Sequence, residues 1–512
     1  MAIYQPIENS GARRRLELRS PVDLQPFGEI ECATAEDVQE AVARAREAQP
    51  GWGATSFDER ARVVYRFIDR FLERQEEVLS IIERETGKAP TEAINMEMVA
   101  PLMSAAYYAK RAERFLRPRR RRISGVLRLQ KQLRVAYVPL GVVGIITPWN
   151  GPVALAVNPI VQGLMAGNAV LIKPSEVTPL STQLIAEFFE EAGLPANVLQ
   201  VVVGDGETGE ALVEAGLDKI SFTGSVATGR KVAEACGRQL IPCTLELGGK
   251  DAMIVCSDAD LDRAAAGALI GSCMNTGQYC CGTERIYVVD EHHDQFVAKV
   301  VERARELRQG DTGEYDVGAL FWDRQLDIVD RHVEDAKAKG ARVLVGGRRN
   351  PDLKGLYYEP TVIVDVNHGM DLMRDETFGP IVAIQRVADE GEAVRLARES
   401  AYGLNGNVWT RDKEKGFEIA KQMETGAVCV NDMAVTYGVH EAPFGGRKAS
   451  GVGQVNGKKG LRGYTHELPV IIDRSSKNQY KGGYPYSRKA DQGTRSFARW
   501  VFGNATLRRW LG

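Results

Sequence analysis

The sequence predicts an α/β protein whose parallel β-sheets are covered by helices on both faces. Between residues 141 and 236, four apolar segments rich in β-branched residues alternate with helical segments, which is the pattern of consecutive βαβ units. A second α/β stretch runs from about residue 248 to residue 445. The chain has 512 residues, and domains usually contain about 100–200 residues. We therefore expect two or three domains.

The first 140 residues predict two helical stretches followed by two strands. A helix should begin after Thr34, because Thr34 and Asp37 resemble a capping box. A second helical stretch should extend from Phe57 to about Gly87. The segments ISGVLRLQ and KQLRVAYVPL at 123–140 follow the basic cluster RPRRRR and read as strands.

The βαβ units follow in order. The predicted strands lie in VVGIITPW, AVLIKP, VLQVVV and KISFTGS, and the helices after them cover 161–166, 181–192, 208–215 and about 229–236. Sheets of this kind bind ligands at the carboxyl ends of their strands, so the turns after these segments are the first place to look for a site.

Composition excludes several functional classes. The chain is 44% apolar and 26% charged with a formal net charge of -2, which gives no overall case for nucleic acid binding. No stretch reaches the ~18 apolar residues of a membrane-spanning helix, and the first twenty residues lack the apolar centre of a secretory signal. We expect a cytoplasmic setting in which the eight cysteines are free thiols. The six histidines form no metal-binding pattern, and we assign no metal.

Two glycine-rich turns could hold a phosphate. Residues 204–209, GDGETG, match G-x-G-x-x-G, but Asp205 and Glu207 would place carboxylates against a pyrophosphate, which favours a simple tight turn. Residues 222–229, FTGSVATG, carry no acidic residue. Gly224 and Ser225 at the start of a helix suit a phosphate better.

Seven short motifs then point to one family. Together, and in this order, they resemble the NAD(P)-dependent aldehyde dehydrogenase superfamily, non-acylating and of bacterial type, over about residues 20–470. The motifs are TPWNGP (147–152), KPSE (173–176), FTGS (222–225), LELGGK (245–250), NTGQYC (275–280), ETFGP (376–380) and PFGGRKASG (443–451).

The resemblance implies an aldehyde dehydrogenase-like fold with a Rossmann-type NAD-binding domain, an α/β catalytic domain and a β extension used for oligomerisation. The implied boundaries are 1–121 and 141–247 for NAD binding, 248–445 for catalysis, and 122–140 with 446–473 for oligomerisation. It also implies a homodimer or homotetramer.

Three catalytic residues are carried over from the resemblance. Cys280 matches the family's nucleophile, and its neighbour Cys281 is expected to pack or to line the pocket. A thiolate attacks an aldehyde to give a thiohemiacetal and, after hydride transfer, a thioester. Asn150 is expected to stabilise the oxyanion together with the Cys280 backbone N–H. Glu246 is expected to activate the water that hydrolyses the thioester.

The resemblance also implies a site for NAD. A carboxylate at Glu176 can accept hydrogen bonds from the ribose hydroxyls and would repel a 2′-phosphate. Some relatives with this glutamate use both cofactors, so NADP stays open. The expected cofactor-binding residues are Ile146, Thr147, Trp149, Lys173, Glu176, Gly206, Phe222, Gly224, Ser225, Leu247, Glu376 and Phe378.

The substrate pocket is expected to be roomy and apolar. Gly151 stands where relatives often carry an aromatic residue, and the positions of two arginines in succinate-semialdehyde enzymes correspond to Asn158 and Met274. Medium-chain aliphatic or aromatic aldehydes are therefore the expected substrates. The expected pocket residues are Gly151, Leu155, Tyr279, Cys281, Tyr437 and Phe444.

Other interpretations stay open. Local stretches resemble a branch of succinate-semialdehyde dehydrogenases. The rival interpretations are a CoA-acylating dehydrogenase, a thiol esterase and a catalytically silent relative. The presence of Glu246 favours hydrolysis over CoA acylation. The segment 474–512 carries nine Lys and Arg residues against one Asp. Phe497, Trp500 and Val501, and again Leu507, Trp510 and Leu511, share helical faces. This extension either packs on a neighbouring subunit or makes a peripheral membrane contact.

Overall fold

The computed structural model describes residues 2–7, 13–433, 435–475 and 484–511, without the side chains of residues 510 and 511. The expected face formed by Leu507, Trp510 and Leu511 therefore lies partly outside the described residues. The chain divides into two compact units, one of residues 1–112 and 139–464 and one of residues 113–138 and 465–512. Each is described separately.

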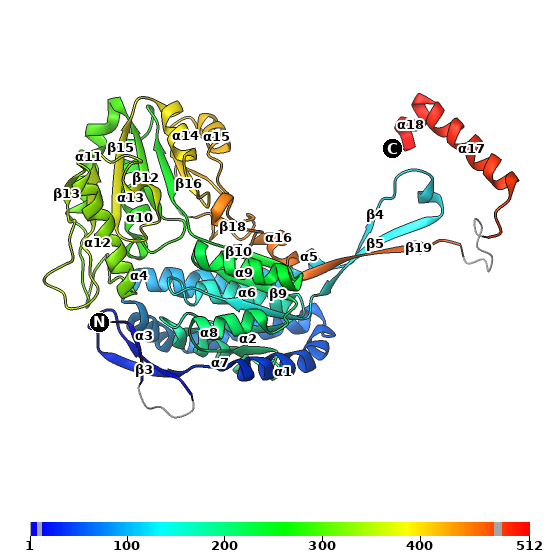
Figure 1. Cartoon of the computed structure of the whole chain (residues 1–512), viewed down its shortest axis with the longest axis horizontal. Coiled ribbons are helices and arrows are strands. Elements are labelled where there is room, and N and C mark those ends of the chain that lie inside the picture. The colour runs from blue at the N-terminus through cyan, green and yellow to red at the C-terminus, as the bar shows by residue number, and fades with distance from the viewer. Residues whose placement is uncertain (1, 8–12, 434, 476–483, 512) are drawn as a thin grey trace. The chain divides into compact units, whose positions relative to one another are not determined.

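A six-stranded sheet forms the first half of the larger unit (Figure 1). All its neighbours pair in parallel except β18 with β10. In sheet order the strands are β18 (Gly451–Val452), β10 (Cys243–Glu246), β9 (Lys219–Thr223), β6 (Val142–Ile146), β7 (Ala169–Lys173) and β8 (Leu199–Val201).

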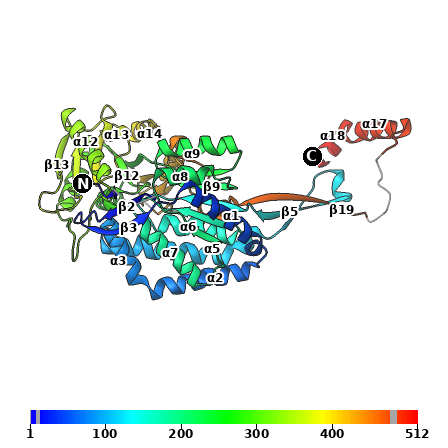
Figure 2. The same cartoon turned by 60° about the horizontal axis from the view of Figure 1, so that its bottom comes forward.

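Helices cover both faces of this sheet, as the βαβ pattern predicted. Alternate strand residues pack with α1, α8 and α9 on one face, and α6 lies on the other with α2 and α7 behind it (Figure 2). The helices of this half are α1 (Ala35–Gly53), α2 (Phe57–Glu73), α3 (Gln75–Thr86), α4 (Pro90–Glu92), α5 (Ala100–Leu116), α6 (Ala154–Met165), α7 (Pro179–Glu191), α8 (Gly206–Glu214), α9 (Val226–Gln239) and the π-helix η1 (Ala93–Val99).

A seven-stranded sheet forms the second half of the same unit. It is parallel except for the edge strand β13. Its order is β13 (Arg342–Val345), β14 (Thr361–Val364), β15 (Ile381–Val387), β12 (Thr283–Val289), β11 (Asp251–Val255), β16 (Gly406–Trp409) and β17 (Cys429–Val430). The helices of this half are α10 (Leu261–Cys273), α11 (Asp290–Ala304), α12 (Asp323–Ala338), α13 (Asp371–Arg374), α14 (Glu390–Arg398), α15 (Lys413–Gln422) and the 3₁₀ turns η3 (Met274–Gly277) and η4 (Lys448–Ser450). The short helix α16 (Gly457–Arg462) packs on α6 of the first half.

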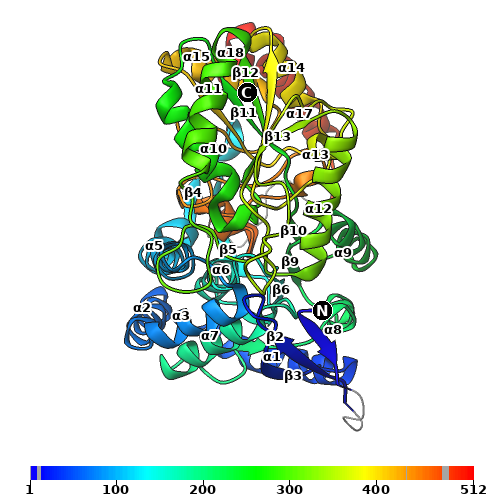
Figure 3. The ribbon, with the colours of Figure 1, turned by 90° about the vertical axis from the view of Figure 1, so that its left-hand side faces the viewer.

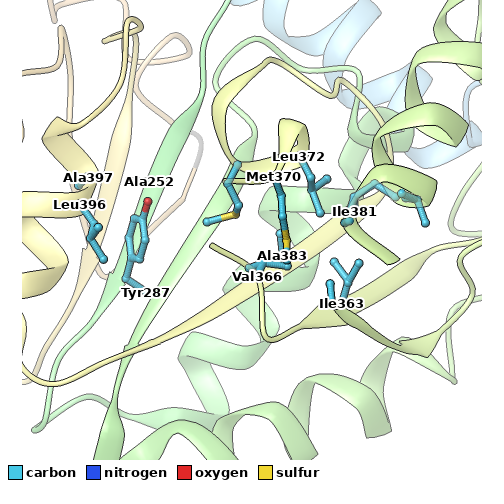
Figure 4. Close-up of a cluster of buried hydrophobic side chains, with 14 of the residues drawn as sticks. Ala252, Tyr287, Ile363, Val366, Met370, Leu372, Ile381, Ala383, Leu396 and Ala397 are labelled. Atoms are coloured by element: carbon cyan, nitrogen blue, oxygen red, sulfur yellow. The ribbon is translucent and has the colours of Figure 1, made fainter. Parts of the chain in front are cut away.

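The strands of this second sheet are buried on both faces. In Figure 3, α10 and α11 lie on one side and α12, α13 and α14 on the other. Tyr287 and Ala252 point to the second side, where they join Met370, Leu372 and Leu396 in an apolar cluster (Figure 4). Burial on both sides explains the continuous apolar runs at residues 252–255, 286–289 and 381–384.

Two three-stranded sheets complete the fold. At the N-terminus, β1 (Tyr4–Pro6), β2 (Arg15–Arg19) and β3 (Pro26–Glu31) form an antiparallel meander. In the smaller unit, β19 (Thr465–Asp473), β5 (Lys131–Pro139) and β4 (Arg119–Arg121) form the second sheet. Helices α17 (Arg488–Gly503) and α18 (Ala505–Leu511) follow.

Local predictions hold where short-range signals are strong. Thr34 and Asp37 make both hydrogen bonds of a capping box, and α17 ends at Gly503. The expected helical stretch from Phe57 to Gly87 is divided into α2 and α3 at Arg74. The strand predicted for ISGVLRLQ is wrong, because Val126–Leu129 form a 3₁₀ turn, η2, and β5 pairs with the basic segment Arg119–Arg121 instead.

Candidate active site

Cys280, Asn150 and Glu246 come from three separate elements and border two adjoining cavities. Asn150 follows β6, Glu246 is the last residue of β10, and Cys280 precedes β12. A cavity of about 360 Å³ is lined by Asn150 and Cys280, and a smaller one of about 30 Å³ by Glu246 and Cys280. Cys280 is therefore reached from both sides, with the amide on one and the carboxyl on the other.

The two adjacent cysteines have different surroundings. Cys280 is half-buried, whereas Cys281 is fully buried against Leu404 and Phe444. Their sulfur atoms lie 3.7 Å apart. Burial raises the pKa of the Cys281 thiol well above its usual value, so Cys281 stays a thiol and packs. All eight cysteines are free, as expected.

Asn150 is held rigidly beside the thiol. The side-chain Nδ2 of Asn150 donates to the backbone carbonyl of Gln278 at 3.0 Å. The backbone carbonyl of Asn150 accepts from Asn275 Nδ2 at 2.9 Å and from Lys88 Nζ at 3.1 Å. An amide group carries two N–H donors. One is engaged with Gln278, which leaves the other for the larger cavity that Asn150 lines.

A buried ion pair supports this amide. Lys88 and Glu97 are in contact and their side chains are fully inaccessible. Glu97 Oε2 also accepts from the backbone N–H groups of Val153 and Ala154, each at 3.0 Å, at the start of α6. Glu97 lies in the π-helix η1, an irregularity that often occurs at functional sites. The pair therefore fixes both ends of the segment that carries Asn150.

Glu246 is a buried carboxyl without a partner. Among the described residues, neither of its oxygens has a hydrogen-bond partner. Burial, and then the charge of Cys280, raise its pKa well above 4.5, so it is protonated over a wider pH range than an exposed glutamate. The cavity of about 30 Å³ that it shares with Cys280 has room for a water molecule.

Two glycines of LELGGK permit close approach. A Cβ on Gly248 would lie 2.5 Å from Glu376 Oε2, and one on Gly249 would lie 2.5 Å from the Cys280 carbonyl oxygen. Their role in the structure is to let the Cys280 and Glu376 segments pack against the end of β10.

Glu376 and Phe378 are positioned by a second buried ion pair. Lys250 donates to Glu284 at 2.5 Å, and Glu284 accepts from the backbone N–H groups of Thr377 and Phe378 at 2.8 and 2.9 Å. These bonds hold Phe378 at a positive φ of 53°. Burial raises the pKa of Glu376 to about 8, with the Glu284 charge adding to it. Lys250 and Glu284 carried no sign of this role in the sequence.

Lys173 and Glu176 form a polar corner at the end of β7. Lys173 Nζ donates to the Pro174 carbonyl at 2.9 Å and to Glu176 Oε2 at 3.3 Å. The Tyr4 hydroxyl, from β1, donates to Glu176 Oε1 at 3.4 Å. Burial, and then the Glu176 charge, raise the pKa of Tyr4 to about 12. No motif predicted Tyr4, because it is 172 positions away.

The other residues assigned to the cofactor lie around the carboxyl ends of β6, β9 and β10. The Thr147 hydroxyl is buried and has no partner among the described residues. Trp149 packs edge-on to Phe378, with ring centres 5.5 Å apart. Ile146, Phe222 and Leu247 are buried in the core beneath α1, α8 and α9. Ser225 caps α9, beside Gly224.

The GDGETG turn has a structural explanation. Asp205 caps α8 and pairs with Arg14 of the N-terminal region at 2.5 Å, and Gly204 is at a φ of 150°, where a Cβ would strike Thr208. Gly206 begins α8. A carboxylate already paired with an arginine fits a tight turn better than a pyrophosphate cradle.

The larger cavity has an apolar wall. Gly151, Leu155, Tyr279 and Tyr437 of the expected pocket line it. Phe444 lines only the smaller cavity, and Cys281 lines neither of the two. Sequence reasoning missed the remaining wall residues, which no motif marks: Met96, Ala100, Ala154, Val435, Gly438 and Val439.

Fold and site together are typical of one class of protein, an enzyme that attacks its substrate with a thiol and is built on α/β sheets of the nucleotide-binding type. Residues 7–468 match the aldehyde dehydrogenase family. The chain belongs to this family and has its α/β fold, so it is an oxidoreductase that acts on aldehydes.

Individual relatives agree with this assignment. A putative NADP⁺ succinate-semialdehyde dehydrogenase of Mycolicibacterium smegmatis is 42% identical over 91% of this chain and 90% of its own length. A 4,4′-diapolycopene aldehyde oxidase of a Methylomonas species is 37% identical over 95% and 91%. The crystal structure of a Mycobacterium tuberculosis aldehyde dehydrogenase complexed with NAD⁺ superposes with a TM-score of 0.86 at 36% identity, covering 91% of this chain and 96% of that one.

Proposed function

We propose that this protein oxidises apolar aldehydes to carboxylic acids, with NAD as the hydride acceptor. The observation that carries the proposal is the position of Cys280 between the apolar cavity and the smaller cavity of Glu246. An aldehyde carbonyl can approach the thiol from the first cavity. A water molecule can approach the same carbon from the second.

In the proposed reaction, the Cys280 sulfur bonds to the aldehyde carbon, and Asn150 stabilises the resulting oxyanion with its remaining N–H. Bound NAD would supply the hydride acceptor at that carbon, and loss of the hydride would leave a thioester on Cys280. Glu246 in its ionised form removes a proton from water, which attacks the thioester. The acid leaves, and the thiol is regenerated. CoA-acylating relatives generally lack this glutamate, so Glu246 favours hydrolysis.

The residues present fit NAD. Glu176 can accept hydrogen bonds from ribose hydroxyls, and its charge opposes a 2′-phosphate. Lys173 holds that carboxylate in place, and the unpartnered Thr147 hydroxyl offers a further polar contact. The Mycolicibacterium smegmatis relative is named for NADP⁺, and the similar Mycobacterium tuberculosis structure is complexed with NAD⁺, so NADP is the alternative to test.

Apolar substrates are favoured by the cavity wall. Its described residues include no lysine or arginine, and a buried carboxylate without a cation would be poorly held. Asn158 is committed to Tyr437, Asn456, Ser104 and Gln162. The Methylomonas relative is named for 4,4′-diapolycopene aldehyde. The names of other relatives make succinate semialdehyde the second candidate.

The regions have separate proposed roles. We assign residues 1–121 and 141–247 to NAD binding and 248–445 to catalysis. Residues 122–140 and 446–473 are assigned to oligomerisation into a homodimer or homotetramer. The exposed apolar side chains of the smaller unit support the last assignment, since Leu129 is 72% and Ile471 67% exposed. Sedimentation equilibrium tests it: a monomer at micromolar concentration would contradict it.

The activity test is NADH formation by purified protein with hexanal, benzaldehyde or succinate semialdehyde. Cys280→Ala is the test variant, and Cys281→Ala is the matched control one position away. We expect activity in the wild type and in Cys281→Ala, none in Cys280→Ala, and a higher kcat/KM for hexanal than for succinate semialdehyde. The reverse preference would overturn the substrate assignment. Turnover that requires CoA would overturn hydrolysis. Hydrolysis of a test ester such as p-nitrophenyl acetate, with no NADH formed from any aldehyde, would identify an esterase.

A further inference from the structure

The last two helices form a surface that the enzyme fold does not use. The family match ends at residue 468, whereas α17 and α18 span residues 488–511. α17 contacts α18, and both belong to the smaller unit (red in Figure 1).

One face of α17 is apolar and aromatic. Phe497, Trp500 and Val501 follow the i, i+3, i+4 spacing that places side chains on one face of a helix. Val501 is buried, but Phe497 is 41% and Trp500 64% exposed. Tyr484 and Tyr486, just before the helix, are 86% and 70% exposed. A group of exposed aromatic side chains of this size usually marks a binding surface.

The opposite face of α17 is basic. Arg488, Arg495 and Arg499 are separated by seven and four residues and share that face. Lys489 on α17 and Arg508 and Arg509 on α18 add three more positive charges, against Asp491 alone. None of these six basic side chains forms an ion pair with a carboxylate of the described residues. The charges are therefore available to a partner.

We propose that α17 and α18 bind an anionic lipid surface, with Phe497 and Trp500 inserted at the headgroup level and the arginines held against lipid phosphates. A helix with an aromatic face and a basic face has the properties of a helix lying in the membrane interface, and tyrosine and tryptophan prefer the same depth. None of the described helices combines the length and apolar content that spanning a membrane requires.

Charge favours lipid over a second copy of this chain. The whole chain has a formal net charge of -2, so another copy offers no strongly acidic surface by composition alone, whereas an anionic leaflet complements every basic residue of the pair. Each basic residue near such a surface strengthens binding about fivefold. The proposal is independent of which aldehyde the enzyme oxidises.

The test is flotation of the full chain with vesicles of phosphatidylcholine, with or without phosphatidylglycerol. We expect the protein to float with the anionic vesicles only, and to be released at about 1 M salt, where the Debye length falls to ~3 Å. The charge variant is Arg495→Glu/Arg499→Glu, which should weaken binding by at least about 25-fold. The apolar variant is Phe497→Ser/Trp500→Ser, which should weaken binding to the anionic vesicles even in low salt.

The matched control is Arg62→Glu/Arg66→Glu. These two arginines are exposed on α2 at the same i, i+4 spacing, so the charge change is identical but lies outside the proposed surface. Its flotation should be that of the wild type. Circular dichroism of each variant verifies that it is folded.

Two results would overturn the proposal. One is equal flotation of the full chain and a chain that ends at Asp473, or of the tail variants and the control. The other is a full chain that does not float at all. If the chain ending at Asp473 then also assembles into fewer subunits than the full chain in sedimentation, the surface is an interface between copies of this chain.

Discussion

Replacing Lys88 with methionine probes the ion pair beneath Asn150. Lys88 and Glu97 are fully buried, and the Lys88 ammonium also donates to the Asn150 carbonyl at 3.1 Å. Methionine keeps the unbranched shape but removes the charge, which leaves Glu97 as a buried carboxylate without its cation. Breaking one side of a buried pair costs about 3–5 kcal/mol. We expect the free energy of unfolding, measured with urea, to fall by that amount.

A second substitution separates stability from catalysis. Glu97→Gln removes the negative charge but keeps an oxygen that can accept from the N–H groups of Val153 and Ala154. The double variant K88M/E97Q should therefore regain most of the lost stability. The Asn150 carbonyl still lacks its ammonium donor, so kcat for hexanal should stay below wild type, by up to the ~10²–10³ that loss of an oxyanion donor costs.

Lys421→Met is the control for this pair, because Lys421 forms an exposed ion pair with Glu418. Its effect should be under about 1 kcal/mol. The reasoning would be refuted if K88M were as stable as the control. It would be refuted equally if K88M/E97Q recovered full activity together with its stability.

Four further outcomes are expected. Burial and the Cys280 charge raise the pKa of Glu246, so its basic form appears only as pH rises through that raised value, and wild-type turnover should rise with pH. In steady-state NADH assays, Glu246→Gln should abolish this rise and slow hydrolysis about 10²–10⁴-fold. Glu176→Gln should raise the ratio of kcat/KM with NADP to that with NAD at least about tenfold, ~1.4 kcal/mol, and an unchanged ratio would remove Glu176 from cofactor choice. Gly151→Phe should fill the larger cavity, since a Cβ there already lies 3.2 Å from Leu155, and lower kcat/KM for benzaldehyde more than for acetaldehyde; equal loss for both would argue against the cavity as the substrate site. Phe67→Ala should cost about 3–5 kcal/mol in urea unfolding, because Phe67 stacks on Phe189 at 4.0 Å and both are fully buried.

Elements with strong local signals were predictable. The capping box at Thr34 and the alternating strands and helices after residue 141 depend on residues close together in the chain. The segment 123–130 shows the limit of this reasoning. Its β-branched content favours a strand, but β5 pairs with Arg119–Arg121 instead, since tertiary context overrides local β-propensity.

The sequence by itself determined the family, because seven motifs occur in the family's order, and with it the assignment of Cys280, Asn150 and Glu246 as candidates. Only the tertiary structure decided what surrounds them. It placed Lys88 and Glu97 under Asn150, Tyr4 on Glu176, and Lys250 with Glu284 behind Phe378. The wall formed by residues 96–100 and 435–439 is likewise a result of folding. The physical reason is common to all of them. A buried charge is paired, and an apolar wall is formed, by the side chains that the fold brings near. These side chains come from positions too far apart in the chain for a local sequence pattern to predict their contact.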